Sequence, residues 1–221
     1  MISEEVLAAN LALPAFGLVT LTWGNVSGID RERGVVAIKP SGVPYESMTA
    51  EDIVLVDLDG NVVGGERRPS TDTPSHLELY RAHEWIGGVV HTHSTWATSW
   101  AQAEREIPVL GTTHADLSDR PIPLTRRLTE AEIGEEYEAA TGRALVAATN
   151  EHESCALVRG HGPFAWGASP AAAVEVAVTL EQVAEMALLT MLLAPDGPML
   201  ADAVRRKHFE RKHGPHAYYG Q

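Results

Sequence analysis

Two pairs of short strand-like runs near the start of the chain place the strongest constraint on its fold. Asn25–Ile29 and Gly34–Ile38 are joined by a polar turn, and Ile53–Leu58 and Asn61–Val63 flank the dipeptide Asp59-Gly60. Asp-Gly between two such runs is a strong signal of a β-hairpin. The pattern predicts neighbouring antiparallel strands at the centre of the fold.

Helical patterns occupy much of the remaining chain. Capping residues, prolines at first-turn positions and apolar residues at helical spacing indicate where helices begin and how far they run. The expected helices are Ser3 to about Pro14, Thr73 to about Glu84, Ser94–Gln102, Thr129 to about Thr141, Pro170–Leu193 and Met199 to about Lys212. Further strands are expected at Gly87–His93 and Cys155–Val158. We therefore predict an α/β fold in which a central, mainly antiparallel β-sheet is flanked by α-helices.

The length of the chain limits the number of domains. It has 221 residues and shows neither an internal repeat nor a low-complexity linker, so we expect one domain over residues 1–221. A chain of this length buries a sizeable core without help from a disulfide or a structural metal. A metal site in it therefore need not be a device for folding.

Charge and cysteine content exclude some classes of protein. The chain has 17 Lys and Arg against 30 Asp and Glu, a net charge of −13, which argues against a nucleic-acid binder or an anionic membrane surface as partner. Cys155 is the only cysteine, so no intrachain disulfide forms. No secretory signal is recognisable, and the longest apolar stretch, Met186–Pro195, is too short to span a membrane. We expect a cytoplasmic protein.

Histidines at strand spacing indicate a metal site. His91 and His93 are two residues apart in an expected strand, so their rings project from the same face and can reach one ion. His161, between two glycines, can supply a third nitrogen, and Asp72 a carboxylate. Such a donor set suits a transition-metal dication. The alternative, a polar strand face that merely contacts water, stays open on this pattern alone.

Three loops rich in small and hydroxyl residues are candidates for binding a phosphate. They are Thr22-Trp23-Gly24-Asn25, Lys39-Pro40-Ser41-Gly42 and Ser70-Thr71, each at the end of an expected strand or helix. Free backbone N–H groups in such loops cradle anions, and Lys39 would add a positive charge. None is an established nucleotide-binding motif, and each alone is also typical of an ordinary turn.

Three segments outside these loops carry further candidate groups. Basic residues gather in the last helix, and two adjacent tyrosines, Tyr218 and Tyr219, follow it; such a tail is expected to dock, for instance over the site of a neighbouring subunit. His114 and Asp116 lie in an expected loop, where they form either a local turn network or an acid–base pair. The glutamates at positions 130–138 are expected to form a solvated helix face.

Taken in order, these segments resemble the class II aldolase family of zinc-dependent sugar-phosphate enzymes, and within it the L-ribulose-5-phosphate 4-epimerases. The resemblance covers nearly the whole chain. It rests on Glu5–Ala12 (EVLAANLA), Leu18–Ser27 (LVTLTWGNVS), Ile38–Val43 (IKPSGV), Asp72-Thr73-Pro74, Gly87–Ser94 (GGVVHTHS), Gly111–Asp116 (GTTHAD), His161–Gly167 (HGPFAWG) and Arg211–Gln221.

The resemblance implies a role for each matching residue. It implies a class II aldolase-like fold, a Zn²⁺ site (with Mn²⁺ or Co²⁺ as alternatives), a phosphorylated ketopentose as substrate and a homotetramer with active sites between subunits. The implied metal ligands are Asp72, His91, His93 and His161. The implied phosphate-side residues are Gly24, Asn25, Lys39, Ser41, Gly42, Ser70 and Thr71, and the implied acid–base pair is Asp116 and Tyr219.

Besides a sugar-phosphate dehydratase of the same fold, two other interpretations compete with an epimerase. A true aldolase of the fuculose-phosphate type resembles this chain, but such enzymes have a longer glutamate at the position of Asp72. A zinc-stabilised interaction protein without catalysis is the other, and the length of the chain argues against it, since the core needs no metal.

Overall fold

A seven-stranded sheet in which every neighbouring pair of strands is antiparallel forms the centre of the molecule. The computed structural model describes residues 1–150 and 153–218. The strand order is β4-β3-β2-β1-β5-β7-β6. The strands are β1 (Asn25–Asp30), β2 (Val35–Ile38), β3 (Val54–Asp57), β4 (Val62–Gly64), β5 (Gly88–His91), β6 (Cys155–Leu157) and β7 (Pro163–Gly167). The predicted antiparallel α/β fold is confirmed.

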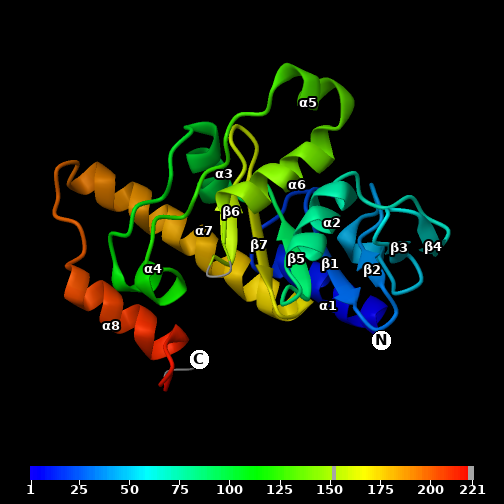
Figure 1. The fold of residues 1–221 in the computed structure, drawn as a ribbon, viewed down its shortest axis with the longest axis horizontal. Helices are drawn as coiled ribbons and strands as arrows, with labels where there is room; N and C mark the ends of the chain where they lie inside the picture. Colours follow the sequence, from blue (N-terminus) through cyan, green and yellow to red (C-terminus); the bar gives the residue numbers. More distant parts are fainter. Residues whose placement is uncertain (151–152, 219–221) are drawn as a thin grey trace.

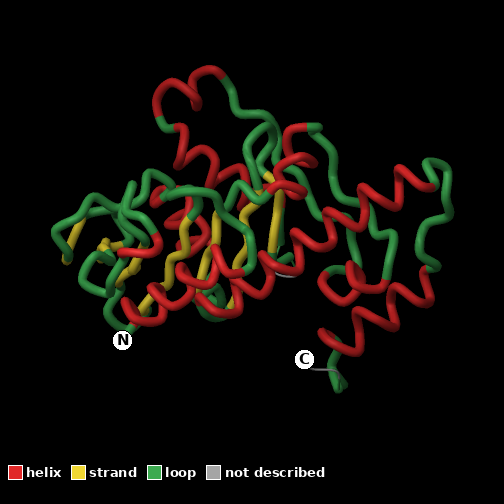
Figure 2. The backbone as a smooth tube through the Cα atoms, turned by 180° about the vertical axis from the view of Figure 1, so that it is seen from behind, coloured by secondary structure: helices red, strands yellow, loops and turns green. Residues whose placement is uncertain are grey.

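Helices cover both faces of this sheet. They are α1 (Ile2–Ala15), α2 (Thr73–Ala82), α3 (Thr95–Gln102), α4 (Thr112–Leu117), α5 (Glu130–Glu135), α6 (Tyr137–Ala148), α7 (Pro170–Leu193) and α8 (Asp202–His213), with a 3₁₀ turn at Tyr45–Ser47. Helices α2 and α6 pack on each other over the face seen in Figure 1, whereas α1 and α7 cross the opposite face, seen in Figure 2. Helices α4 and α8 lie side by side beyond the end of the sheet.

Alternating side chains of the central strands fill two apolar cores. Val90 of β5 belongs to the core beneath α1 and α7, while its neighbour Val89 belongs to the core beneath α2 and α6. His91, the last residue of β5, stacks on Phe164 of β7 and therefore lies on the same side as Val89. The alternation of side chains along the strand thus places His91 on the face of the sheet that α2 and α6 cover.

Helix α7 is the one helix of the described residues that is long and apolar enough to cross a membrane. It nevertheless packs against β5, β7, α1 and α3 and contributes buried residues to the core, as the sequence predicted for a core or interface helix. Its carboxy-terminal end leaves large apolar side chains exposed, among them Leu192 at 69% and Leu193 at 88%.

Several elements differ from the sequence prediction. The helix expected from Thr129 to about Thr141 begins with the predicted capping box, but the backbone leaves the helical conformation at Glu136, and α6 then continues to Ala148. The segment 112–117 is a helix rather than a loop, and β7 was not expected as a strand. Strand β5 ends at His91, so His93 follows the strand instead of lying within it.

Candidate metal and phosphate site

A pocket of about 450 Å³ opens where the ends of several elements meet. The end of β5, the turn before β7, the loops before β1 and after β2 and the first residues of α2 and α6 all contribute to it. Its walls are Thr22, Trp23, Gly24, Asn25, Lys39, Pro40, Ser41, Gly42, Ser70, Thr71, Asp72, His91, His93, Tyr137, Glu138 and His161.

Three histidines converge in this pocket. Each of His91, His93 and His161 offers one ring nitrogen, and these atoms all lie within 4.8 Å of one another. The Nε2 atoms of His93 and His161 are 3.0 Å apart. Strand pairing explains the convergence, because β5 pairs with β7 with His91 opposite Phe164, which brings the turn that precedes β7 beside the end of β5.

The buried ring of His91 has one defined tautomer. Its Nδ1 lies 2.9 Å from the carbonyl oxygen of Pro163, which only accepts, so Nδ1 carries the proton and Nε2 keeps its lone pair. Burial lowers the pKa of His91, and burial with the neighbouring His91 and His93 lowers the pKa of His161 to about 4. Neutral imidazoles are the form that binds a metal.

Asp72, at the start of α2, lies in the same pocket but outside the three-histidine cluster. Its Oδ2 accepts hydrogen bonds from Asn25 Nδ2 at 2.6 Å and from Ser70 Oγ at 3.4 Å. Burial acts to raise the pKa of Asp72, but the nearby His91 and His76 and the Asn25 amide outweigh it, so the pKa is lowered. The carboxylate therefore stays ionised and faces the histidines with a negative charge.

Lys39 places a positive charge deep in the same pocket. The residue is 2% exposed, and its Nζ donates to the carbonyl oxygens of Thr22 at 3.2 Å and Pro40 at 3.4 Å. It lies 4.8 Å from the centre of the Tyr45 ring. Among the described residues no carboxylate forms an ion pair with it. Burial lowers the pKa of Lys39, and an anion bound beside it would relieve this cost.

Hydrogen bonds between backbones hold the small-residue loops around Lys39. Ser70 N donates to Lys39 O at 3.0 Å, and Ser41 N donates to Arg68 O at 2.9 Å, which ties two of the loops together. The Tyr45 hydroxyl donates to the carbonyls of Trp23 and Gly24, each at 2.8 Å.

The loop of residues 22–25 requires a glycine at position 24 for two reasons. It has a φ of +77°, and a Cβ at this position would lie 2.7 Å from Val19 Cγ1 and 3.0 Å from the carbonyl oxygen of His91. A side chain here would therefore displace the backbone beside a histidine of the cluster.

The structure gathers eleven of the thirteen predicted site residues in this pocket, and Asp116 lies apart from it. Asp116 lies on α4, where its carboxylate accepts from Arg211 and His208 of α8 at 2.9–3.2 Å. Burial acts to raise the pKa of Asp116, but Arg211 and His208 outweigh it and lower the pKa. Tyr219 lies outside the described residues.

Two residues of the wall were missed by the sequence analysis. Tyr137 and Glu138 open α6, and the Tyr137 hydroxyl lies 3.1 Å from Nδ1 of His161. Glu138 was expected to belong to a solvated helix face, whereas it lines the pocket. Only the interruption of the helix at Glu136 brings these two residues to the pocket. A prediction of one uninterrupted helix would have turned a different helix face towards the pocket.

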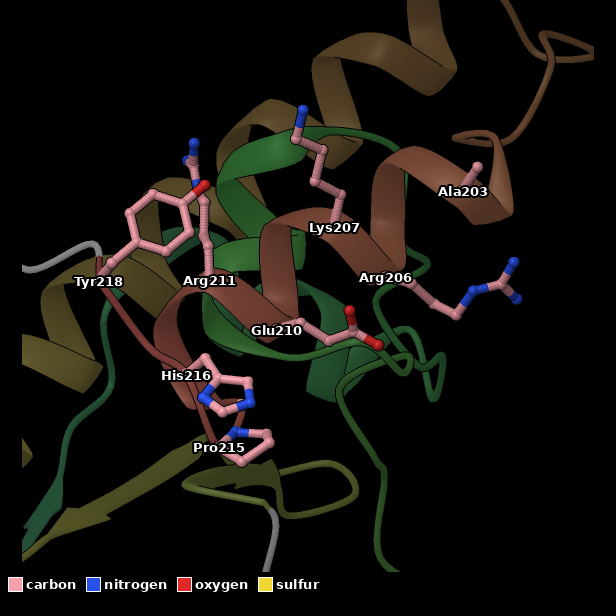
Figure 3. Close-up of a pocket in the computed structure, with 9 residues that line it drawn as sticks. Ala203, Arg206, Lys207, Glu210, Arg211, Pro215, His216 and Tyr218 are labelled. Carbon is pink, nitrogen blue, oxygen red and sulfur yellow. The ribbon is translucent and has the colours of Figure 1, made fainter.

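A larger cavity, of about 610 Å³, lies along α8 rather than at the histidines. Figure 3 shows Arg206 and Lys207 extending from the helix and the Tyr218 ring beside Arg211. Tyr218 N donates to Arg211 O at 3.0 Å, so the tail folds back along the helix as far as the described residues extend. Among the described residues around this cavity there is no convergent set of metal-binding side chains like that of the histidine pocket.

An antiparallel sheet whose strand ends carry converging histidines, with helices on both faces, is the class II aldolase fold. Residues 4–188 match the family model described as the Class II Aldolase and Adducin N-terminal domain, and the chain belongs to this family.

Solved structures of the same fold agree with this membership. The chain is 26% identical to an L-fuculose 1-phosphate aldolase, with a TM-score of 0.82 and 95% of each chain covered. It is 27% identical to the l-fuculose-1-phosphate aldolase from Thermus thermophilus, with a TM-score of 0.70, over 89% of this chain and 98% of that one. An aldolase II superfamily protein from Pseudomonas syringae shares the fold at 18% identity, with a TM-score of 0.79 over 98% and 87% of the two chains.

Proposed function

We propose that this protein is a metal-dependent sugar-phosphate enzyme that interconverts L-ribulose 5-phosphate and D-xylulose 5-phosphate by breaking and re-forming the C3–C4 bond. The observation that carries the proposal is a site for a cation and a site for an anion in one pocket: three converging histidines and a buried lysine without a carboxylate partner among the described residues. A phosphorylated sugar that chelates a metal needs both.

The histidines suit a dication by their chemistry. His91 turns the lone pair of Nε2 away from Pro163, and His93 and His161 bring their own Nε2 atoms together, so we assign these three as ligands with Asp72 as the fourth. The set fits Zn²⁺, with Mn²⁺ or Co²⁺ as alternatives. A dication held there supplies Lewis-acid stabilisation for negative charge on the C2 and C3 oxygens of the substrate.

The loops around Lys39 suit the phosphate. Lys39 supplies the positive charge, and the hydroxyl groups and backbone N–H groups of the loops supply hydrogen bonds. We assign this role to Gly24, Asn25, Lys39, Ser41, Gly42, Ser70 and Thr71. In this arrangement the phosphate end of the sugar stays fixed while the other end reacts.

The hydrogen on C4 is not acidic, so inversion at C4 requires cleavage of a carbon–carbon bond. A base takes the proton of the C4 hydroxyl, the C3–C4 electron pair moves towards C2, and an enediolate and glycolaldehyde phosphate result. The aldehyde, still held by its phosphate, rotates and presents its other face, and the enediolate re-adds. The new C4 alkoxide forms on the opposite side and takes a proton there, so two proton-transfer groups are needed.

We assign these two roles to Asp116 and Tyr219 of a neighbouring subunit. Within one chain Asp116 does not line the pocket, and both α4 and α8, the helix that precedes the tail, belong to the part of the molecule that extends beyond the sheet. The exposed apolar end of α7 in the same region offers a surface for a second copy. A homotetramer with sites between subunits brings these groups together.

An aldolase of the fuculose-phosphate type is the second candidate, and the two L-fuculose phosphate aldolases above favour it. Asp72 favours the epimerase, since the aldolases resembled by this chain carry a longer glutamate at that position. A coupled assay decides between them. Formation of D-xylulose 5-phosphate from L-ribulose 5-phosphate supports the epimerase, whereas release of a free aldehyde from fuculose 1-phosphate, with no epimerisation, contradicts it.

A further inference from the structure

His91 and His161 differ in the group that contacts Nδ1, the ring nitrogen that does not face the other histidines. Nδ1 of His91 donates to the backbone carbonyl oxygen of Pro163. This acceptor belongs to the main chain, so a side-chain substitution does not remove it. Nδ1 of His161 instead faces a side chain, the hydroxyl of Tyr137, at 3.1 Å. The turn that carries His161 is held through its backbone, by His161 N to Val158 O at 3.0 Å, and this bond leaves the imidazole free to rotate.

Tyr137 lies beside His161 because it belongs to the first turn of α6. Ser75 Oγ of α2 donates to Glu138 O at 2.6 Å, and Thr141 Oγ1 donates to Tyr137 O at 2.8 Å. The rings of Tyr137 and His161 lie nearly parallel, at 10°, with centroids 6.2 Å apart. The backbone that carries the phenol is thus fixed by α2 and α6, two elements that carry none of the three histidines.

We propose that Tyr137 is a positioning residue that holds His161 in the orientation and tautomer in which Nε2 faces the other two histidines. The inference rests on the metal site proposed above. With the proton on Nδ1 and donated to the Tyr137 oxygen, Nε2 keeps its lone pair 3.0 Å from Nε2 of His93. Without the hydroxyl, the imidazole rotates or takes the Nε2–H tautomer, which binds no cation through that atom.

Tyr137→Phe tests the proposal because it removes the hydroxyl and keeps the ring. Zn²⁺ affinity is measured on the metal-free protein by competition with a chromophoric chelator. Loss of an outer partner of a histidine ligand typically lowers metal affinity by about 10–100-fold, and we expect a loss of this size. The thermal midpoint of the metal-free protein and its affinity for inorganic phosphate should not change. Tyr218→Phe, at a tyrosine that is 77% exposed, is the matched control and should bind Zn²⁺ like the wild type.

The outcomes separate this inference from the function on which it rests. Equal Zn²⁺ affinity of wild type and Tyr137→Phe overturns the positioning role and leaves the metal site intact. Failure of the wild type to bind Zn²⁺ overturns the proposed function itself. A lower thermal midpoint of metal-free Tyr137→Phe in step with the loss of affinity shows that Tyr137 supports the fold instead.

Nitrogen-15 NMR of the wild type gives a measurement that needs no variant. We expect His161 of the metal-free protein in the Nδ1–H tautomer, and an Nε2–H tautomer contradicts the proposal.

Discussion

Lys39 shows how one residue defines what the pocket binds. Removing a lysine from water is costly unless its charge is compensated, and here two carbonyl oxygens and an aromatic ring are its only polar or aromatic partners among the described residues. The protein buries this positive charge without a carboxylate partner among the described residues, although its acidic residues outnumber its basic ones and give a net charge of −13. The anion site proposed above explains why a destabilising buried charge is present at this position.

Lys39→Met tests this interpretation, because methionine fills a similar volume without the charge. A charge-assisted hydrogen bond contributes about 1.5–3 kcal/mol, so we expect the KM for the sugar phosphate to rise roughly 10–100-fold. Thermal stability should stay equal or increase, since an uncompensated buried charge is removed. Steady-state kinetics and a thermal melt of the same preparation provide both values. A variant that melts earlier but keeps its KM would show that Lys39 serves the fold.

At the residue scale, spacing and family resemblance were enough to gather most of the site. The His-x-His pair, Asp72 and the loop around Lys39 line one pocket, although His93 follows β5 instead of lying within it. Tyr137 was out of reach, because its contact with His161 depends on how α6 is oriented against α2. The same holds for Asp116, whose ion pair with Arg211 and hydrogen bond with His208 of α8 become visible only once α4 and α8 are packed together.

At the scale of elements, the contact between α2 and α6 sets the pocket wall. Gly142 lies in the middle of α6, and a Cβ there would approach Glu78 Cβ to 2.7 Å and Ser75 Cα to 2.9 Å. The two helices therefore approach each other more closely than any side chain at position 142 allows. The same contact places Tyr137 and Glu138 beside the start of α2, close to Asp72.

Gly142→Ala should consequently destabilise the protein although alanine is the better helix former. Overpacking of this kind costs about 1–3 kcal/mol, more than the roughly 1 kcal/mol that alanine gains in helix propensity. Gly134→Ala in α5 is the matched control, because a Cβ there meets nothing within 4 Å. Denaturant unfolding should show a loss for the first variant and no loss for the second; equal behaviour of both would contradict the close contact.

Elements were predictable from sequence where local signals were strong. Helix α7 begins and ends at the predicted residues, since Ser169 caps it and Pro170 occupies its first turn. Strand β7 was missed because Pro163–Gly167 is buried throughout and shows no alternation of apolar and polar residues. Helix α4 was missed because its six residues are too few for a helical period to show, and packing against α7 and α8 stabilises it instead.

At the scale of the whole molecule, the two apolar cores are large enough that folding does not depend on a bound metal. The buried apolar residues of both cores extend over the sheet, α1, α2 and α7, and the three-histidine cluster lies at their edge. We expect chelation to abolish activity while the far-UV circular dichroism spectrum and cooperative unfolding persist. Loss of the folded signal on chelation would contradict this and would favour the interpretation of a zinc-stabilised interaction protein.

The last prediction concerns how subunits share a site. Asp116 is tied to α8 through His208 and Arg211, and Tyr218, the residue before Tyr219, is hydrogen-bonded to Arg211. Asp116 and Tyr218 therefore belong to one α4–α8 unit of one chain, and we expect Tyr219 to act together with Asp116 of the same chain. If this unit serves the pocket of a neighbour, the histidines come from one subunit and both proton-transfer groups from another.

Mixing inactive variants tests this division. When His161→Ala and Asp116→Asn subunits exchange freely in equal amounts, about a quarter of the sites combine intact histidines with an intact α4–α8 unit, and activity should return to that extent. Mixing Asp116→Asn with Tyr219→Phe subunits should restore nothing, because every chain then lacks one of the two groups. Subunit exchange is confirmed in both mixtures with a mass-labelled chain. Recovery in the second mixture would mean that Asp116 and Tyr219 reach a site from different chains, and no recovery in the first would mean that each chain completes its own site.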